Sequence, residues 1–198
     1  MAAALIKHRK ARHGLLKGRT PLGRAALFLV GVGALYMVSS AVLALTGAVP
    51  TAPVVAGMDI DNYYFWQMLF VVPFVLAVWV LASGVLLVLG KKEHGRSAVP
   101  AEASWAWGGP LLVVWIPSAV EAAFMAFGMG QEEWVGILSE PGVWQAIYLG
   151  FFLFAGVYAV RDFVLAARLV HKKSWPAAIL TGIAAATVAV GAYALFIR

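Results

Sequence analysis

Glu121 is the acidic residue that lies deepest in an apolar stretch of this sequence, in WIPSAVEAAFMAF. An ionisable group in lipid costs at least about 2.5–3.5 kcal/mol, which makes it a candidate functional residue. Polar residues expected at matching depth on neighbouring stretches are Gln67, Tyr63, Gln145 and Tyr148, and Ser118 lies one turn away on the same stretch. Among them the carboxyl group is expected to be protonated, because burial disfavours its charge. It can serve as a hydrogen-bonding helix-packing group, a proton or cation site, or a ligand contact.

Arg161 and Asp162 are adjacent charges in VYAVRDFVLAARLVHKK. Neighbouring residues on a helix do not face each other, so we expect each to find its own partner. A span of about 20 residues from Gly142 ends at Arg161. Residues 163–173 would then continue as helix in the cytoplasmic interface, where long basic side chains reach lipid phosphate. The basic residues of this interface are Arg161, Arg168, Lys172 and Lys173.

A search for catalytic and cofactor motifs gives no candidate. The four histidines, His8, His13, His94 and His171, lie outside the apolar stretches or at their edge, so no intramembrane pair is available for haem. The sequence has no cysteine and no HExxH, GxSxG or P-loop pattern. We therefore expect no enzymatic activity, no cofactor and no metal site.

The elements that position these residues follow from composition. Of 198 residues, 63% are hydrophobic and 12% are charged, which excludes a soluble globular domain. Continuous apolar stretches predict five transmembrane helices near residues 22–47, 63–90, 105–129, 142–170 and 175–197. Residues 130–141 are expected to form a loop. The predicted fold is an all-α polytopic membrane bundle at 21–198, preceded by a basic segment at 1–20.

The positive charges predict the orientation. Fourteen of the fifteen Lys and Arg residues fall on one side of the predicted spans, so the N-terminus is expected to be cytoplasmic and the C-terminus external. The N-terminal segment is either an orientation anchor or a surface that binds anionic lipid or a partner. Its basic residues are Lys7, Arg9, Lys10, Arg12, Lys17 and Arg19.

Small and aromatic residues predict how the spans pack and where they meet the interface. Small side chains let helices approach closely, and the candidates for such contacts are Gly31, Gly33, Ala178, Gly182 and Ala186. Tryptophans favour membrane interfaces, and we expect Trp66, Trp134 and Trp144 near the outer boundary, with Trp105, Trp107 and Trp175 near the inner one.

Several segments resemble the bacterial branch of the Yip1 family, over roughly residues 20 to 198. They are NYYFWQMLFVVPF, KKEHGRS, WAWGGPLLVVWIPSAVEAAF and VWQAIYLGFFLFAGVYAVRDFVLAARLVHKKSWPAAIL. The resemblance implies five spans, a cytoplasmic N-terminus, an external C-terminus and a non-enzymatic protein. The Asp-Leu-Tyr-Gly-Pro signature of eukaryotic members is absent, so their trafficking role does not carry over.

These observations favour a non-enzymatic scaffold or accessory component of the bacterial inner membrane. Its expected partners are membrane lipids, including anionic head groups, and other membrane proteins, with no nucleic acid. Two alternatives stay open. One is a transporter of a small solute, proton or lipid with Glu121 lining the path. The other is a cofactor-free accessory subunit of a larger membrane redox or energy-transducing complex.

Overall fold

The computed structural model describes residues 21–50, 59–90 and 98–196, and these residues form an all-α bundle. Its helices are α2 (Pro21–Leu45), α3 (Tyr63–Leu89), α4 (Val99–Ala126), α5 (Gln131–Ser139), α6 (Val143–His171) and α7 (Trp175–Phe196). All except α5 are long and apolar enough to cross a membrane. The five predicted spans are therefore confirmed, and the structure is that of an integral membrane protein.

One helix begins earlier than predicted. α4 starts at Val99 rather than at residue 105 and places Pro100 and Glu102 in its first turn. A proline is tolerated there because the first backbone N–H groups of a helix have no partner within it, and an acidic side chain favours the positive end of the helix dipole. The charge of Glu102 therefore does not prevent α4 from beginning before residue 105.

The predicted loop at 130–141 contains a short helix, α5, and that prediction was wrong. Gly130 is extended at its N-cap, with φ −71° and ψ 147°, and Glu132 and Glu133 occupy the first turn. Trp134 is buried and packs on Phe124 of α4, with ring centroids 5.5 Å apart. This aromatic contact attaches the amphipathic helix to the bundle.

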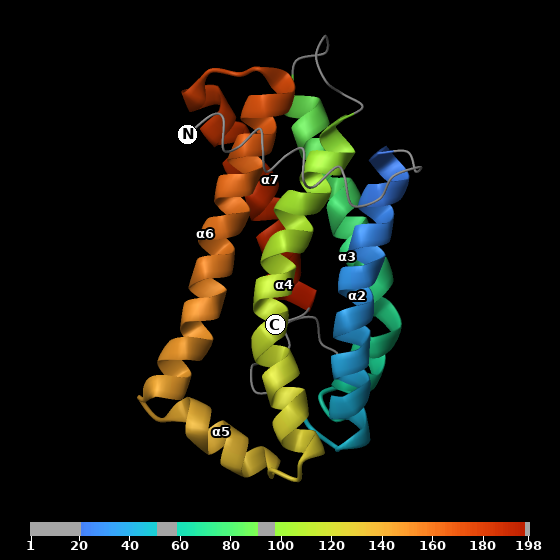
Figure 1. The fold of residues 1–198 in the computed structure, drawn as a ribbon, viewed down its shortest axis with the longest axis vertical. Helices are drawn as coiled ribbons and strands as arrows, with labels where there is room; N and C mark the ends of the chain where they lie inside the picture. The colour runs from blue at the N-terminus through green and yellow to red at the C-terminus, as the bar shows by residue number, and fades with distance from the viewer. Residues whose placement is uncertain (1–20, 51–58, 91–97, 197–198) are drawn as a thin grey trace.

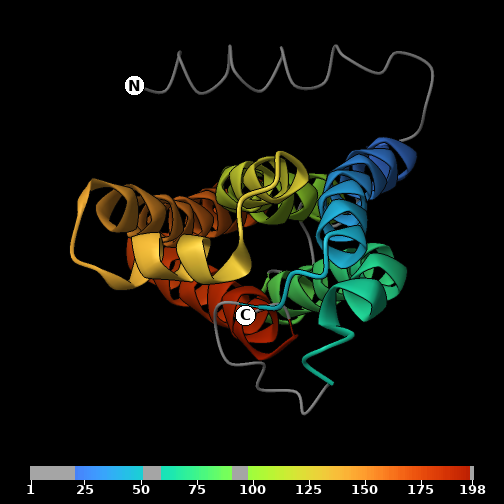
Figure 2. The same cartoon turned by 90° about the horizontal axis from the view of Figure 1, so that it is seen from below.

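The five long helices form two layers. In Figure 2, α6, α4 and α2 make one row, and α7 and α3 lie side by side in the other. α4 contacts α2 and α6, while α7 contacts α6 and α3, and α3 also contacts α2. These contacts close the bundle into a ring of neighbouring helices.

Aliphatic and small side chains fill the interior, and large apolar side chains also cover the outside. Leu29, Val71 and Phe163 are completely buried. In contrast, Leu153 and Leu180 are each 72% exposed. Exposed apolar area of this kind is unfavourable in water and favourable in lipid, which agrees with the span assignment.

Two predicted interfacial tryptophans belong to the protein interior. Trp107 is buried and its Nε1 donates to the carbonyl oxygen of Val75 at 3.1 Å, and Trp134 is buried in the contact with α4 described above. Their expected depth near the membrane boundaries stays a prediction, because burial shows which face of a helix a residue occupies and not its depth in the membrane.

The bundle has two distinct ends (Figure 1). The end that α5 crosses is called the α5 end, and the opposite end, where α6 turns into α7, is called the Lys173 end. α7 has 22 residues against 29 in α6. Figure 1 shows that α7, in red, stops well short of α5, so the first turns of α6 extend beyond the described end of α7.

Candidate functional site

Glu121 lies in the last two turns of α4 and is 1% exposed. Tyr64, in the first turn of α3, places its hydroxyl 3.5 Å from Glu121 Oε1, a long hydrogen bond in which the hydroxyl donates. α3 begins at the same end of the bundle at which α4 ends. The first turn of α3 therefore lies beside the last turns of α4, and the two side chains meet across the helix interface. The intramembrane carboxyl group is thereby enclosed by protein rather than by lipid.

A second set of polar groups lies beside this contact. Ser40 Oγ of α2 donates to Gln67 Oε1 at 2.9 Å, and Gln67 Nε2 donates to the Tyr63 hydroxyl at 3.3 Å. The rings of Tyr63 and Tyr64 meet edge to face with centroids 5.3 Å apart. We call these residues the polar cluster: Ser40, Tyr63, Tyr64, Gln67 and Glu121. It joins α2, α3 and α4 at the α5 end.

The polar cluster overlaps only in part with the predicted set. Tyr63 and Gln67 were predicted, whereas Ser40 and Tyr64 were missed. Tyr64 stands three residues before Gln67 on the same face of α3, a spacing that could have identified it. Ser118 is half-buried one turn from Glu121.

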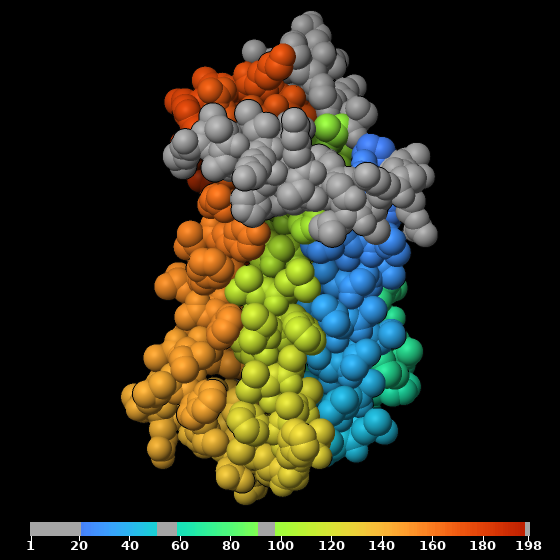
Figure 3. Space-filling model, viewed as in Figure 1, coloured from blue at the N-terminus to red at the C-terminus, as the bar shows by residue number. Residues whose placement is uncertain are grey.

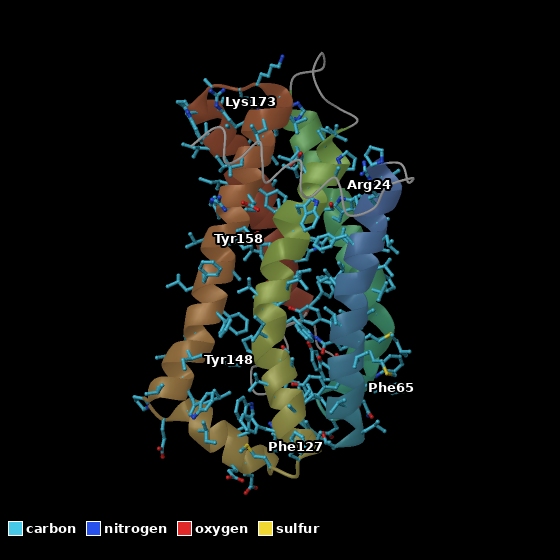
Figure 4. The ribbon with its side chains drawn as sticks, in the orientation of Figure 1. Arg24, Phe65, Phe127, Tyr148, Tyr158 and Lys173 are labelled. Carbon is cyan, nitrogen blue, oxygen red and sulfur yellow. The ribbon has the colours of Figure 1, made fainter. Side chains whose placement is uncertain are left out.

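Gln145 and Tyr148 line a groove between α6, α5 and α7. Figure 4 labels Tyr148 on the part of α6 toward the α5 end, with Tyr158 further along the same helix. The sequence could not show that α5 and α7 contribute to the surroundings of these two residues.

At the Lys173 end, a basic residue predicted to face lipid is directed into the protein. Lys173 is 9% exposed, and its Nζ donates to the carbonyl oxygen of Leu89 and to Thr181 Oγ1, the latter at 2.7 Å. The last carbonyls of a helix lack partners within it and attract cations. Lys173 therefore ties the end of α3 to α7, and its assignment to the exposed basic interface was wrong.

The other basic residues of this turn have different surroundings. Arg168 donates to the backbone carbonyl of Lys173, and its guanidinium lies 5.4 Å from the centre of the Trp175 ring. Lys172 is exposed and ends α6 in the left-handed conformation, with φ 47°. We call this group of residues the Lys173 junction: Arg168, Lys172, Lys173 and Trp175.

Arg161 and Asp162 form a direct pair, contrary to the prediction. Arg161 Nη1 lies 3.1 Å from Asp162 Oδ1, with the arginine side chain 57% exposed and the aspartate 8% exposed. The long arginine side chain lets the guanidinium reach the carboxylate of its neighbour. α6 continues as predicted to His171, and Phe163 and Val170 are buried in the bundle.

Two of the predicted close approaches between helices are confirmed. A Cβ atom on Gly33 would lie 2.9 Å from a methyl group of Val72, and one on Gly182 would lie 2.4 Å from the Cα of Val164. Ala178 and Ala186 are also buried on α7. These residues set the α2–α3 and α6–α7 distances.

Gly31 does not belong to this group, and its assignment was wrong. Nothing lies within 4 Å of where its Cβ would be. Residues two apart on a helix point in nearly opposite directions, so Gly31 and Gly33 cannot both face α3. A contact that the sequence analysis missed is that of Gly90 with the buried His171 ring, which a Cβ would approach to 2.3 Å.

Two further groups of residues bear on ligand binding. Within residues 21–50, 59–90 and 98–196, no three His, Asp or Glu side chains gather as a metal site requires. The basic N-terminal residues Lys7, Arg9, Lys10, Arg12, Lys17 and Arg19 lie outside the described residues, so their role stays a prediction.

The chain can also be set beside known proteins. No protein-family model, curated protein or solved structure matched this chain. The features that describe this chain are those of its structure: five apolar helices, the polar cluster at the α5 end and the basic Lys173 junction at the opposite end.

Proposed function

We propose that this protein is a non-enzymatic integral membrane scaffold or accessory component, placed in the bacterial inner membrane. The observation that supports this role is the position of Glu121, which is 1% exposed and bonded to Tyr64 across the α3–α4 interface. In this arrangement the carboxyl group stabilises the packing of helices. A rigid bundle of this kind suits a protein that presents surfaces to lipids and to other membrane proteins.

The proposed partners follow from the outer surface. The most apolar part of α6 is less buried than that of the other four long helices. The exposed side chains of α6 include Leu149, Leu153 and Val157. This face suits lipid chains or the helix of a partner protein. Arg161 and Lys172 are exposed toward the Lys173 end, where basic groups favour anionic head groups. Membership of the bacterial Yip1 branch is part of the same proposal.

A transporter is the second candidate, and the closeness of two hydrogen-bonded groups in the polar cluster favours it. Ser40, Gln67 and Tyr63 form consecutive hydrogen bonds beside the Tyr64–Glu121 contact. The carboxyl group of Glu121 can gain and lose a proton, and the Tyr64 hydroxyl beside it can donate and accept a hydrogen bond, so this contact can take part in proton movement. In this case Glu121 carries the transported proton rather than a packing contact.

Two substitutions of Glu121 separate the candidates. For a scaffold, Glu121→Gln should be neutral to within about 0.5 kcal/mol because an amide donates and accepts hydrogen bonds. Glu121→Leu should cost about 1–2 kcal/mol through the lost interhelical bond. Ala123→Leu, at an exposed position of the same helix, is the matched control. Unfolding in detergent measures these effects.

Proton or cation uptake into proteoliposomes completes the test. A scaffold gives no uptake with wild type or with either Glu121 variant. Uptake by wild type that Glu121→Gln removes would contradict the scaffold role and establish the transporter. Affinity purification in mild detergent identifies the partner proteins that a scaffold requires.

A further inference from the structure

Two adjoining cavities lie along α6 toward the α5 end. An open groove of about 560 Å³ is lined by α5, α6 and α7, and a smaller cavity of about 90 Å³ lies between α4, α6 and α7. Phe152, Val190 and Tyr193 line both. Because they share these three residues, the two cavities adjoin and form one groove. Figure 3 views the bundle from the side of α6, α4 and α2, with a narrow hollow between α6 and α4 near α5, and α7 lies behind them.

The polarity of this groove changes along its length. Near α5 it is lined by Ser139, Gln145 and Tyr148. Its inner end is formed by aliphatic and aromatic residues, including Leu111 and Ala159. The Nε1 atom of Trp107, which also lines the inner end, is occupied by a bond to α3. An amphiphile would therefore place its polar part near α5 and its apolar part further in.

The groove is long enough for an acyl chain. Gln145 and Ala159 line its two ends, and 14 residues of helix between them correspond to about 21 Å. The hydrocarbon of one leaflet is about 15 Å deep, half of the bilayer core. A cavity of 90 Å³ holds the end of an alkyl chain but not a helix, which is about 10–12 Å wide with its side chains.

The charge near the groove selects the head group. The sequence contains no Lys or Arg from residue 97 to 160, whereas α5 carries Glu132 and Glu133, and Glu140 follows Ser139. These carboxylates repel a net anionic head group and attract a positive amine. We propose that the groove binds one acyl chain of a zwitterionic phospholipid from the leaflet at the α5 end.

Quenching of tryptophan by brominated lipid tests this proposal. Trp107 is 2% exposed and lines the inner cavity, so a brominated chain reaches it through the groove rather than from the surrounding bilayer. In vesicles of phosphatidylcholine with brominated chains, we expect wild type to show quenching that Trp107→Phe removes. Because Trp107 is one of eight tryptophans, this part is up to about one-eighth of the fluorescence.

Two glycines of α6 provide a matched pair for the same assay. Gly156 lines the inner cavity and Gly150 does not, and neither has an atom within 4 Å of its Cβ position. Gly156→Leu should fill the cavity and remove the Trp107 quenching, while Gly150→Leu should keep it. Val190→Phe, which fills the groove from α7, is the second blocking variant.

Three results would overturn the proposal. The first is quenching in both blocking variants equal to that of wild type. The second is equal or stronger quenching of Trp107 by brominated phosphatidylglycerol, which excludes a zwitterionic preference. The third is a wild type without quenching of Trp107, as expected if a second copy or a partner helix covers the groove.

Discussion

Gly182→Ala tests the α6–α7 contact with a single added methyl group. The new Cβ would lie 2.4 Å from the Cα of Val164 and 2.5 Å from its backbone nitrogen. Backbone atoms cannot rotate away as a side chain can, so the two helices must separate by about 1 Å to restore ordinary contact, which weakens dispersion along the interface. Overpacking of this kind typically costs about 1–3 kcal/mol.

Gly191→Ala is the matched control on the same helix, because nothing lies within 4 Å of its Cβ position. Both substitutions gain about 0.5–1 kcal/mol from the higher helix propensity of alanine, so their difference isolates the packing cost of about 1–3 kcal/mol. Thermal unfolding in detergent, followed by tryptophan fluorescence, measures the difference. Equal unfolding midpoints for the two variants would refute the close α6–α7 approach.

Three further predictions concern the Lys173 end. Lys173→Met should lower the free energy of unfolding by about 1–3 kcal/mol, since it leaves a carbonyl of α3 and a hydroxyl of α7 without their donor. An unfolding midpoint of Lys173→Met above that of the control variant Lys172→Met would contradict this. Lys172→Gly should stabilise the protein by about 0.5–1 kcal/mol in the same assay because glycine adopts a positive φ without strain; a lower midpoint would oppose it. Reporters fused after Lys92 and Lys173 should both read cytoplasmic and one fused within α5 external, and the reverse pattern would disprove the predicted orientation.

The spans were predictable because they depend on local composition. About 20 consecutive apolar residues indicate a transmembrane helix whichever neighbours it has. Local composition does not indicate α5, which is short and polar. This helix depends instead on the burial of Trp134 against α4, so it was missed. The start of α4 was misplaced because a proline and a glutamate suggest a boundary, although both are favourable in a first turn.

The candidate site was less predictable because it depends on how distant segments align. Tyr64 and Glu121 are 57 residues apart in sequence, and only the register of α3 against α4 brings them together. Depth in the membrane identified Gln67 but could not distinguish the face of the bundle on which Gln145 lies. Similarly, charge identified Lys173 as interfacial, whereas the unpartnered carbonyls of α3 direct it inward.

The ring of helices has a consequence for the order of assembly. α7 is the last described helix to be synthesised, yet it lies between α6 and α3, and α3 ends at Leu89, 86 residues before α7 begins at Trp175. Until α7 arrives, the side of α3 that contacts α7 in the finished bundle lacks this neighbour. Contacts between distant parts of a chain form late and slowly. Completion of the bundle is therefore a post-insertion step, and the partly assembled protein exposes α3 for as long as the ribosome takes to finish the chain.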